Sequence, residues 1–438
     1  MTILTHGVGT RQDLPIPFSY ALAGAVIALV VSFVALGLLW QEPRLVGGRA
    51  GRPLPSALAR ILDSAGFRWT LRIAGLLATG WVLAAALFGP DDALNPTAGV
   101  VYVLFWVGVL VVASVLFGPV WRALNPLRTL HLLLTRVARI DPADGLLRYP
   151  PRLGLWPAAV TLLAFVWLEL VAPERATLPV LRLWFAVFVA VMVVGSAVFG
   201  ARWFDGADGF EAYSTLMGRM SVLGRRDDRV LVTRSPLNGL AGLVPGPGLS
   251  AVVVVLLGST AYDGLSNSPS WIARTQRYGE PVLTGTLGLI GMVAIVAVTY
   301  VGATMLAGRL GATPRSTLPG EFAHSIVPIA LGYVVAHYYS LFIVVGQQTL
   351  QQLSDPLGTG ADYFGLAERG ISYAWVTPTF VSTLQVVAVV TGHVLGVVLA
   401  HDRAVRLFPR RQALVGQLPL LAVMIFYTLG GLTLLFAA

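Results

Sequence analysis

Ten apolar runs, each about as long as a bilayer-spanning helix, dominate this chain of 438 residues. A hydrocarbon core about 30 Å thick needs roughly 20 apolar residues in helical form. The runs lie at residues 19–40, 70–89, 100–120, 153–172, 179–200, 244–262, 282–308, 320–346, 374–400 and 415–436. Because a helix satisfies its backbone hydrogen bonds internally, the pattern predicts an all-α, polytopic transmembrane helical bundle of about ten helices.

The composition excludes a water-soluble protein. Hydrophobic residues make up 56% of the chain, charged residues only 12%, and the mean hydropathy is +0.76. We therefore expect residues 1–438 to form a single integral membrane domain whose main partner is the lipid bilayer. The absence of Cys excludes disulfides and thiolate chemistry. The net charge of +9 is explained by loops at the membrane surface, so no nucleic-acid partner is expected.

Arginine is distributed unevenly between the loops on the two sides. All 30 basic residues are Arg, and 23 of them lie in five alternate loops, at 41–69, 121–152, 201–243, 309–320 and 401–414. Loops that remain in the cytoplasm are enriched in basic residues. We therefore expect these five loops to be cytoplasmic, both termini to lie outside, and the chain to reside in a cytoplasmic (inner) membrane.

The longest of these loops, 201–243, contains the stretch GFEAYSTLMGRMSVLGRR. It is interpreted either as a solvated basic loop or as an amphipathic helix at the membrane surface. A faint repeat links LFGPVWRALNP (116–126) to VFGARWFDGAD (198–208), 82 residues further along. That spacing fits a duplicated helical hairpin, although few positions match and chance also explains it.

Four of the six histidines lie in or beside the eighth and ninth runs: His324, His337, His393 and His401. If the two helices are antiparallel, a rise of about 1.5 Å per residue places His324 between His393 and His401 in depth. The same reasoning places His337 level with Gln385. Small residues recur at intervals of four on both helices: Gly332, Ala336, Gly392, Gly396 and Ala400. That pattern predicts that the two helices approach closely.

These polar residues allow several interpretations. A metal site would use His324, His393, His401 and Asp402, with a divalent metal ion as cofactor, because imidazole and carboxylate bind zinc, copper or iron. A proton relay would use His337, His393, His324 and Asp402 as a string across the bilayer. Haem ranks lowest, because His337 has no histidine at its depth. In the structural interpretation, each His is a buried hydrogen-bonding residue or an interfacial anchor.

A second polar patch continues outward along the eighth run in the sequence AHYYSLFIVVGQQ. Such a helix cannot face lipid on all sides, so we expect His337 and either Tyr338 or Tyr339 to point into the bundle. Together with Gln385 they would line a cavity or a relay. Asp263 follows the sixth run near the same outer level, where an ordinary turn competes with a place in that cavity.

Four longer stretches are distinctive. They are HGVGTRQDLPIPFSYALAGAVIALVVSFVALGLLWQEPRL, FGPVWRALNPLRTL, WFDGADGFEAYSTLMGRMSVLGRR and GHVLGVVLAHDRAVRLFP. Together they resemble a family of bacterial polytopic membrane proteins labelled fenitrothion hydrolase, over nearly the whole chain. The resemblance implies hydrolysis of an organophosphate ester, with a hydrophobic small molecule as substrate and a metal-activated water as the usual nucleophile.

The chain contains no nucleophile elbow, no phosphate-cradling loop and no H-E-x-x-H motif. Any chemistry must therefore come from residues scattered over several helices. The sequence is compatible with three functions. They are a metal-assisted hydrolase, a transporter or proton- or ion-conducting protein that uses the same polar residues, and a non-catalytic subunit of a membrane complex.

Overall fold

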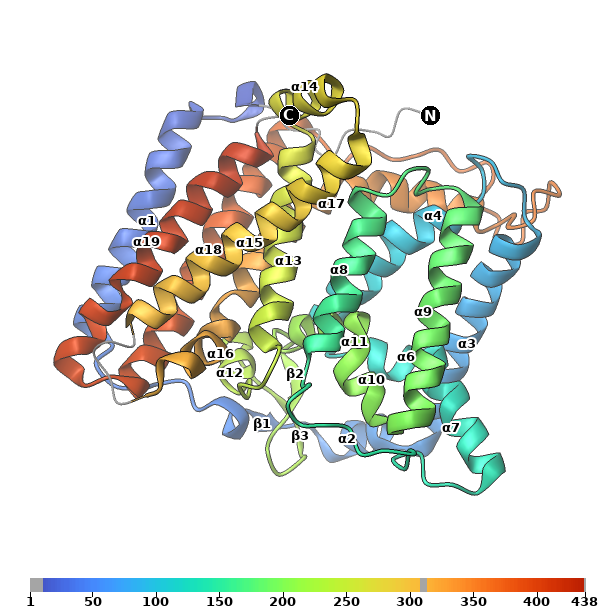
Figure 1. Cartoon of the computed structure of the whole chain (residues 1–438), viewed down its shortest axis with the longest axis horizontal. Coiled ribbons are helices and arrows are strands. Elements are labelled where there is room, and N and C mark those ends of the chain that lie inside the picture. Colours follow the sequence, from blue (N-terminus) through green and yellow to red (C-terminus); the bar gives the residue numbers. More distant parts are fainter. Residues whose placement is uncertain (1–10, 308–312, 437–438) are drawn as a thin grey trace. The chain divides into compact units, whose positions relative to one another are not determined.

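The computed structural model describes residues 11–307 and 313–436. Among these residues, nine helices are long and apolar enough to cross a membrane. They are α1 (Phe18–Leu39), α3 (Ala65–Phe88), the continuous run Thr97–Phe117, α9 (Leu178–Phe199), α13 (Leu249–Ser266), α15 (Pro281–Ala307), α17 (Val327–Gln352), α18 (Pro378–Leu407) and α19 (Arg410–Leu435). The prediction of an all-α polytopic bundle is confirmed (Figure 1).

The fourth predicted span is shorter than expected. The run 153–172 forms α8 (Trp156–Leu170), a 15-residue apolar helix. At about 1.5 Å per residue, such a helix covers roughly 22 Å, less than the hydrocarbon thickness. The other nine predicted runs each coincide with one of the long helices. Residues 309–312 of the predicted loop 309–320 lie outside the described residues.

The chain divides into two compact units. Unit 1 comprises residues 51–233 and 341–373, and unit 2 the described parts of 2–50, 234–340 and 374–438. Both units contain membrane-spanning helices.

Unit 1 contains most of the helices from the first half of the chain. Besides α3, α8 and α9 it contains α2 (Ser56–Asp63), α4 (Thr97–Gly99), the π-helical η3 (Val100–Ala113), α5 (Ser114–Phe117), α6 (Trp121–Leu124), α7 (Pro126–Ala138), α10 (Arg202–Ala207) and α11 (Gly209–Gly218). A small antiparallel sheet has the order β1 (Arg52–Pro53), β3 (Leu231–Thr233), β2 (Leu223–Arg225). Ser64, Asn125 and Asp208 start α3, α7 and α11, because their side-chain oxygens accept backbone N–H groups of the first helical turn.

The position of α11 corrects the expectation for the loop 201–243. Its residues are almost all buried, and the helix packs against η3, α5 and α8. The ring of Phe210 lies within 5.1 Å, between centroids, of three other rings: Phe105, Phe165 and Phe188. The stretch is therefore neither a solvated loop nor a surface helix, because its aromatic side chains complete an aromatic core.

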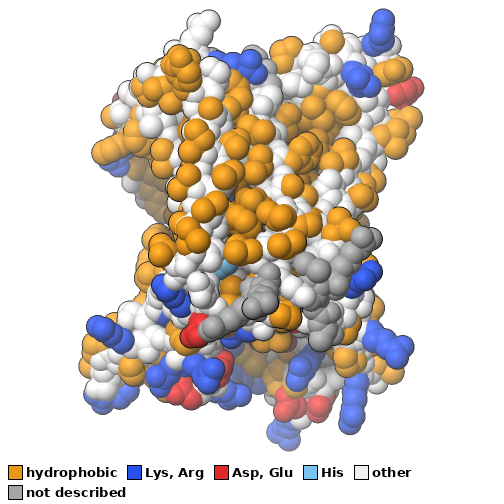
Figure 2. Space-filling model, turned by 90° about the vertical axis from the view of Figure 1, so that its left-hand side faces the viewer, with side chains coloured by type: hydrophobic (Ala, Val, Ile, Leu, Met, Phe, Trp, Pro, Cys, Tyr) orange, Lys and Arg blue, Asp and Glu red, His pale blue; other side chains and the backbone are white. Residues whose placement is uncertain are grey.

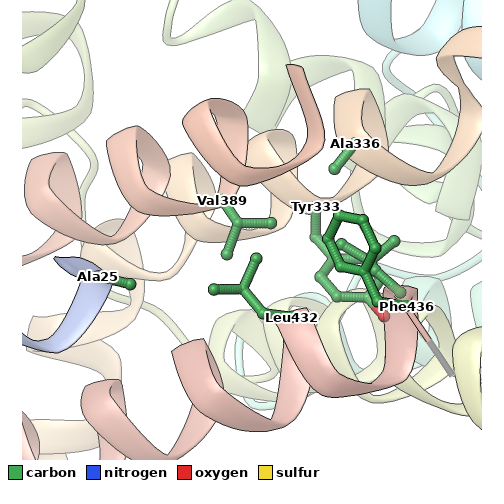
Figure 3. Close-up of a cluster of buried hydrophobic side chains, with 7 residues drawn as sticks. Ala25, Tyr333, Ala336, Val389, Leu432 and Phe436 are labelled. Atoms are coloured by element: carbon green, nitrogen blue, oxygen red, sulfur yellow. The ribbon is translucent and has the colours of Figure 1, made fainter. Parts of the chain in front are cut away.

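Unit 2 contains the remaining helices. Besides α1, α13, α15, α18, α19 and the first half of α17, it includes η1 (Arg11–Asp13), η2 (Gly47–Arg49), α12 (Pro236–Ala241), α14 (Pro269–Tyr278), η5 (Arg315–Thr317), α16 (Leu318–Phe322) and η6 (Ala323–Ser325). Helix α18 packs against α1 and α19, and α15 packs against α13 and α19. Figure 3 shows the buried cluster between α1, α17, α18 and α19, to which Ala25, Tyr333, Val389 and Leu432 each contribute.

Helices α17 and α18 approach as closely as their glycines predicted. A side chain on Gly332 would clash with the carbonyl of Ala388, and a Cβ on Gly392 would lie 2.5 Å from the carbonyl oxygen of Pro328. A Cβ on Gly396 would lie 2.8 Å from that of Ser325. The antiparallel register is thereby fixed, and it puts His337 near the depth of Gln385, as expected.

The outer surface of the spans is apolar. In Figure 2 hydrophobic side chains cover a broad band, and most Arg, Asp and Glu side chains gather at its lower end. On α1 alone, Tyr20, Ile27, Val31, Leu38 and Leu39 are all more than half exposed. So many exposed apolar side chains are compatible with lipid as the solvent and not with water.

Candidate functional site

A carboxylate–imidazole pair lies inside the spans of unit 2. Asp263 on α13 and His337 on α17 form an ion pair with 2.8 Å between Oδ2 and Nε2, and their side chains are only 2% and 5% exposed. The hydroxyl of Tyr338 donates to the same oxygen at 2.7 Å. Two titratable groups are thus held in contact within the hydrophobic part of the unit, where unpaired charges are costly.

The helix α13 places Asp263 there because it continues to Ser266. The interpretation of Asp263 as part of a turn is therefore wrong, and the residue lies beside His337 of α17. Gly264 is needed at the next position, because a Cβ would lie 2.7 Å from the hydroxyl of Tyr333. Tyr333 in turn lies over the His337 ring, with 6.0 Å between centroids and 19° between planes.

The other residues predicted for this cavity or relay are placed differently. Tyr338 points into the bundle, whereas Tyr339 is half-buried and donates to the carbonyl of Trp375. The expectation that His337 and one of the two tyrosines face inward is confirmed. Gln385 is 1% exposed, and its Oε1 has no hydrogen-bond partner among the described residues.

At the opposite end of α18, Asp402 holds the segment that follows α1. Its Oδ1 accepts the indole N–H of Trp40 at 3.1 Å and the backbone N–H groups of Arg44 and Leu45 at 2.7 and 3.1 Å. Its Oδ2 accepts from Arg406 at 3.3 Å. These donors occupy both carboxylate oxygens, so Asp402 serves as a structural anchor.

The histidines nearby bind backbone carbonyls. His401 Nε2 lies 2.9 Å from the carbonyl of Trp40, and His393 Nδ1 lies 2.8 Å from that of Val389 on its own helix. The second ring nitrogen of each, and Nδ1 of His324, has no hydrogen-bond partner among the described residues. Buried nitrogens of this kind are typically satisfied by ordered water.

The predicted metal site is not assembled. Within the described part of the chain, no three His, Asp or Glu side chains lie close enough together to hold a metal ion. The prediction grouped His324, His393, His401 and Asp402 because they lie at similar depths in the bilayer. Depth does not determine the direction in which a side chain points around its helix axis. In the structure, Asp402 and His401 turn toward the segment after α1.

His324 lies outside the spans, in the short helix η6 between α16 and α17. It is 2% exposed, and the carbonyls of Glu321 and Leu399 lie beside its ring. Burial, with a smaller contribution from the charge of Arg403, lowers the pKa of His324 to about 3. The ring is therefore neutral at physiological pH.

A second polar cluster, in unit 1, was not predicted from the sequence as a site. Asp208 Oδ2 accepts from Asn125 at 2.7 Å and from Trp121 at 3.3 Å, and its Oδ1 accepts two backbone N–H groups of α11. Arg128 pairs with Glu211 and Asp205 at 2.5 and 2.6 Å. Burial, followed by the charge of Glu211, raises the pKa of Asp208 to about 7.

The faint repeat gave the only sequence signal for this cluster. In both copies a Phe-Gly pair ends a span, with Gly118 at φ 91°, ψ −168° and Gly200 at φ 65°, ψ −164°. Each copy then forms a short helix followed by an Asx residue that caps a longer one, Asn125 for α7 and Asp208 for α11. The two copies therefore share a local structure, and their capping side chains bond to each other.

Comparisons with models of known protein families, with curated proteins and with solved structures find no match for this chain.

Proposed function

We propose that this chain is a proton-translocating protein of the cytoplasmic membrane, in which the Asp263–His337 pair binds and releases the proton. The observation that carries the proposal is the 2.8 Å contact between these two titratable groups, from two different spans and both nearly inaccessible. Ionisable residues within spans are rare, and they mark ion pathways and proton relays. Histidine changes its charge near neutral pH, which suits reversible proton binding.

One further feature supports a proton path. Buried polar atoms without partners among the described residues recur in η6, α17 and α18, at His324, Tyr333, Gln385 and His393. Waters that satisfy such atoms would supply the hydrogen bonds along which protons move.

The pair would work by exchanging one proton with those waters. The carboxylate of Asp263 stabilises the protonated ring of His337, and Tyr338 holds the carboxylate oxygen that faces the ring. When the ring loses its proton to a neighbouring water, the hydrogen bond from Tyr338 keeps the remaining charge on Asp263 solvated.

Hydrolysis of a hydrophobic organophosphate ester, which the family resemblance implies, has weaker support. A metal-activated water needs several protein ligands around one ion. His324, His393, His401 and Asp402 do not converge in this way. These residues therefore do not form the ligand set that a metal-activated water needs.

The test is voltage-driven proton uptake into vesicles containing the purified full-length chain. A potassium gradient with valinomycin makes the interior negative, and a trapped pH-sensitive dye reports acidification. We expect acidification with the wild type and its loss with Asp263→Asn, which keeps the shape of the side chain but removes its charge.

Glu280→Gln is the matched control, because Glu280 is an exposed acid just before α15 and outside the pair. It should conduct like the wild type. Absence of uptake by the wild type, or equal uptake by wild type and Asp263→Asn, would refute the proposed function.

The orientation that we propose, with the Arg-rich loops in the cytoplasm, has a separate test. The chain has no Cys, so single cysteines can be introduced without background. Thr359 and Ser56 are both exposed, in loops predicted to lie on opposite sides. In intact cells an impermeant thiol reagent should label Thr359→Cys and miss Ser56→Cys, and the reverse result would invert the topology.

A further inference from the structure

The Arg-rich end of α18 ties together three segments of unit 2 through one side chain. Arg403 forms an ion pair with Glu321 of α16, at 2.7 Å between Nη1 and Oε2, and the two side chains are 13% and 22% exposed. Its other terminal nitrogen donates to the carbonyl of Ala241, the last residue of α12, at 3.2 Å. This ion pair is the only contact of Arg403 with a carboxylate that the described residues show.

The ion pair lies directly beside the buried His324. Glu321 precedes His324 by three residues, and its carbonyl lies next to the ring. On the facing helix, Leu399 lies one turn before Arg403, and its carbonyl also lies beside the ring. Glu321 and Arg403 are partly exposed, whereas His324 and Ser325 are 2% and 0% exposed. The pair is therefore more exposed than the ring that lies beside it.

We propose that the Glu321–Arg403 ion pair is the gate at the Arg-rich end of the polar path along α17 and α18. The inference rests on the proposed function, because it names the contact that closes the same path. Closed, the pair holds α16 against α18 and keeps bulk water from His324. Open, it would let α16 move away from α18 and connect His324 to the solution on that side.

The elements on either side suit such a motion. η6 is only three residues long, so little helical structure joins α16 to α17. The α17–α18 contact beyond it is made through Gly332 and Gly392, whose lack of side chains lets the two backbones approach closely, whereas Gly396 faces the carbonyl of Ser325 in η6. Movement would therefore be confined to α16, which the ion pair ties to α18.

The test measures access to Ser325, next to His324, in the otherwise cysteine-free chain. Ser325→Cys is introduced alone and together with Glu321→Gln, Arg403→Gln or the charge swap Glu321→Arg with Arg403→Glu. The proteins are reconstituted in sealed vesicles, and the rate of modification by a charged, impermeant methanethiosulfonate is measured from each side.

We expect slow labelling in the Ser325→Cys parent and about tenfold faster labelling with either single Gln variant, since loss of about 1.4 kcal/mol from the closed state changes its opening tenfold. The acceleration should occur only from the Arg-rich side, and the charge swap should restore slow labelling. Asp228→Asn is the control, because it breaks the surface pair Arg226–Asp228 of unit 1. It should leave the labelling rate unchanged.

Three results would overturn the gate: unchanged rates in both Gln variants, equal acceleration from both sides, or fast labelling that persists in the charge swap. The last two would indicate general loosening of the fold. Because labelling requires no proton flux, a chain that shows gated labelling but no proton uptake would refute the proposed function and retain the gate.

Discussion

Removal of Asp263 should destabilise unit 2 strongly, because the residue is the shared partner of two buried groups. In Asp263→Ala, the imidazole of His337 loses its ion-pair partner and the hydroxyl of Tyr338 loses its acceptor. Breaking a buried ion pair from one side costs about 3–5 kcal/mol. His337→Ala should fall in the same range, since it leaves the carboxylate buried with only neutral donors.

The double variant Asp263→Ala, His337→Ala should cost less than the sum of the two single variants. In the double variant both buried groups are gone, so no unpaired group is left behind. We therefore expect a coupling energy of about 1–3 kcal/mol between the two substitutions. Asp263→Asn should be milder than Asp263→Ala, because an amide oxygen still accepts from Tyr338.

The free energy of unfolding can be measured by titrating the purified protein from mild detergent into SDS, with tryptophan fluorescence as the signal. Glu280→Ala, at an exposed position, is the control and should unfold like the wild type. Additive effects of the two single variants, or a loss below about 1 kcal/mol for Asp263→Ala, would show that contact between Asp263 and His337 does not stabilise the fold.

Three further predictions use the same titration. Gly392→Ala places a methyl group 2.5 Å from the carbonyl of Pro328 and should cost about 1–3 kcal/mol, whereas Gly291→Ala, with no atom within 4 Å, should not destabilise. His324 has a pKa of about 3 when folded and 6.5 as its ordinary value, so the unfolded chain binds the extra proton as the pH falls. The free energy of unfolding should therefore drop by about 2 kcal/mol between pH 8 and pH 5, and His324→Asn should remove this contribution. Asp208→Ala removes the cap of α11 and the acceptor of Asn125 and Trp121, which should cost about 2 kcal/mol or more, while the exposed Asp228→Ala should be silent.

The contact between α17 and α18 could be predicted from the sequence. Both helices have a fixed rise per residue, and glycines at intervals of four mark where two backbones can meet. These regularities set the depths of His324, His337 and Gln385 and the close approach of Gly332 to Ala388. The match in depth did not predict the metal site correctly, because the spacing of residues along a helix does not determine toward which neighbouring helix each side chain points.

The partner of His337 could not be predicted with the same certainty. Asp263 lies 74 residues earlier in the chain, and the Tyr-Asp-Gly sequence around it is equally compatible with a turn. The packing of α13 beside α17 determines the position of Asp263. It brings the imidazole of His337 and the hydroxyl of Tyr338 to a carboxylate that would otherwise need water. A buried carboxylate without water needs such partners, so the helical form of α13, which keeps Asp263 beside His337, is favoured.

The sequence by itself determined that the chain is a helical membrane protein, because hydropathy and length are properties of each segment alone. Tertiary structure alone decided where the polar side chains went. Helix α11 has enough charge and glycine to be a surface segment, yet it is buried, because Phe210 completes an aromatic core and Arg128 neutralises Glu211. These contacts join groups from distant parts of the chain in a medium of low dielectric constant. They cannot be predicted from the local sequence of either segment.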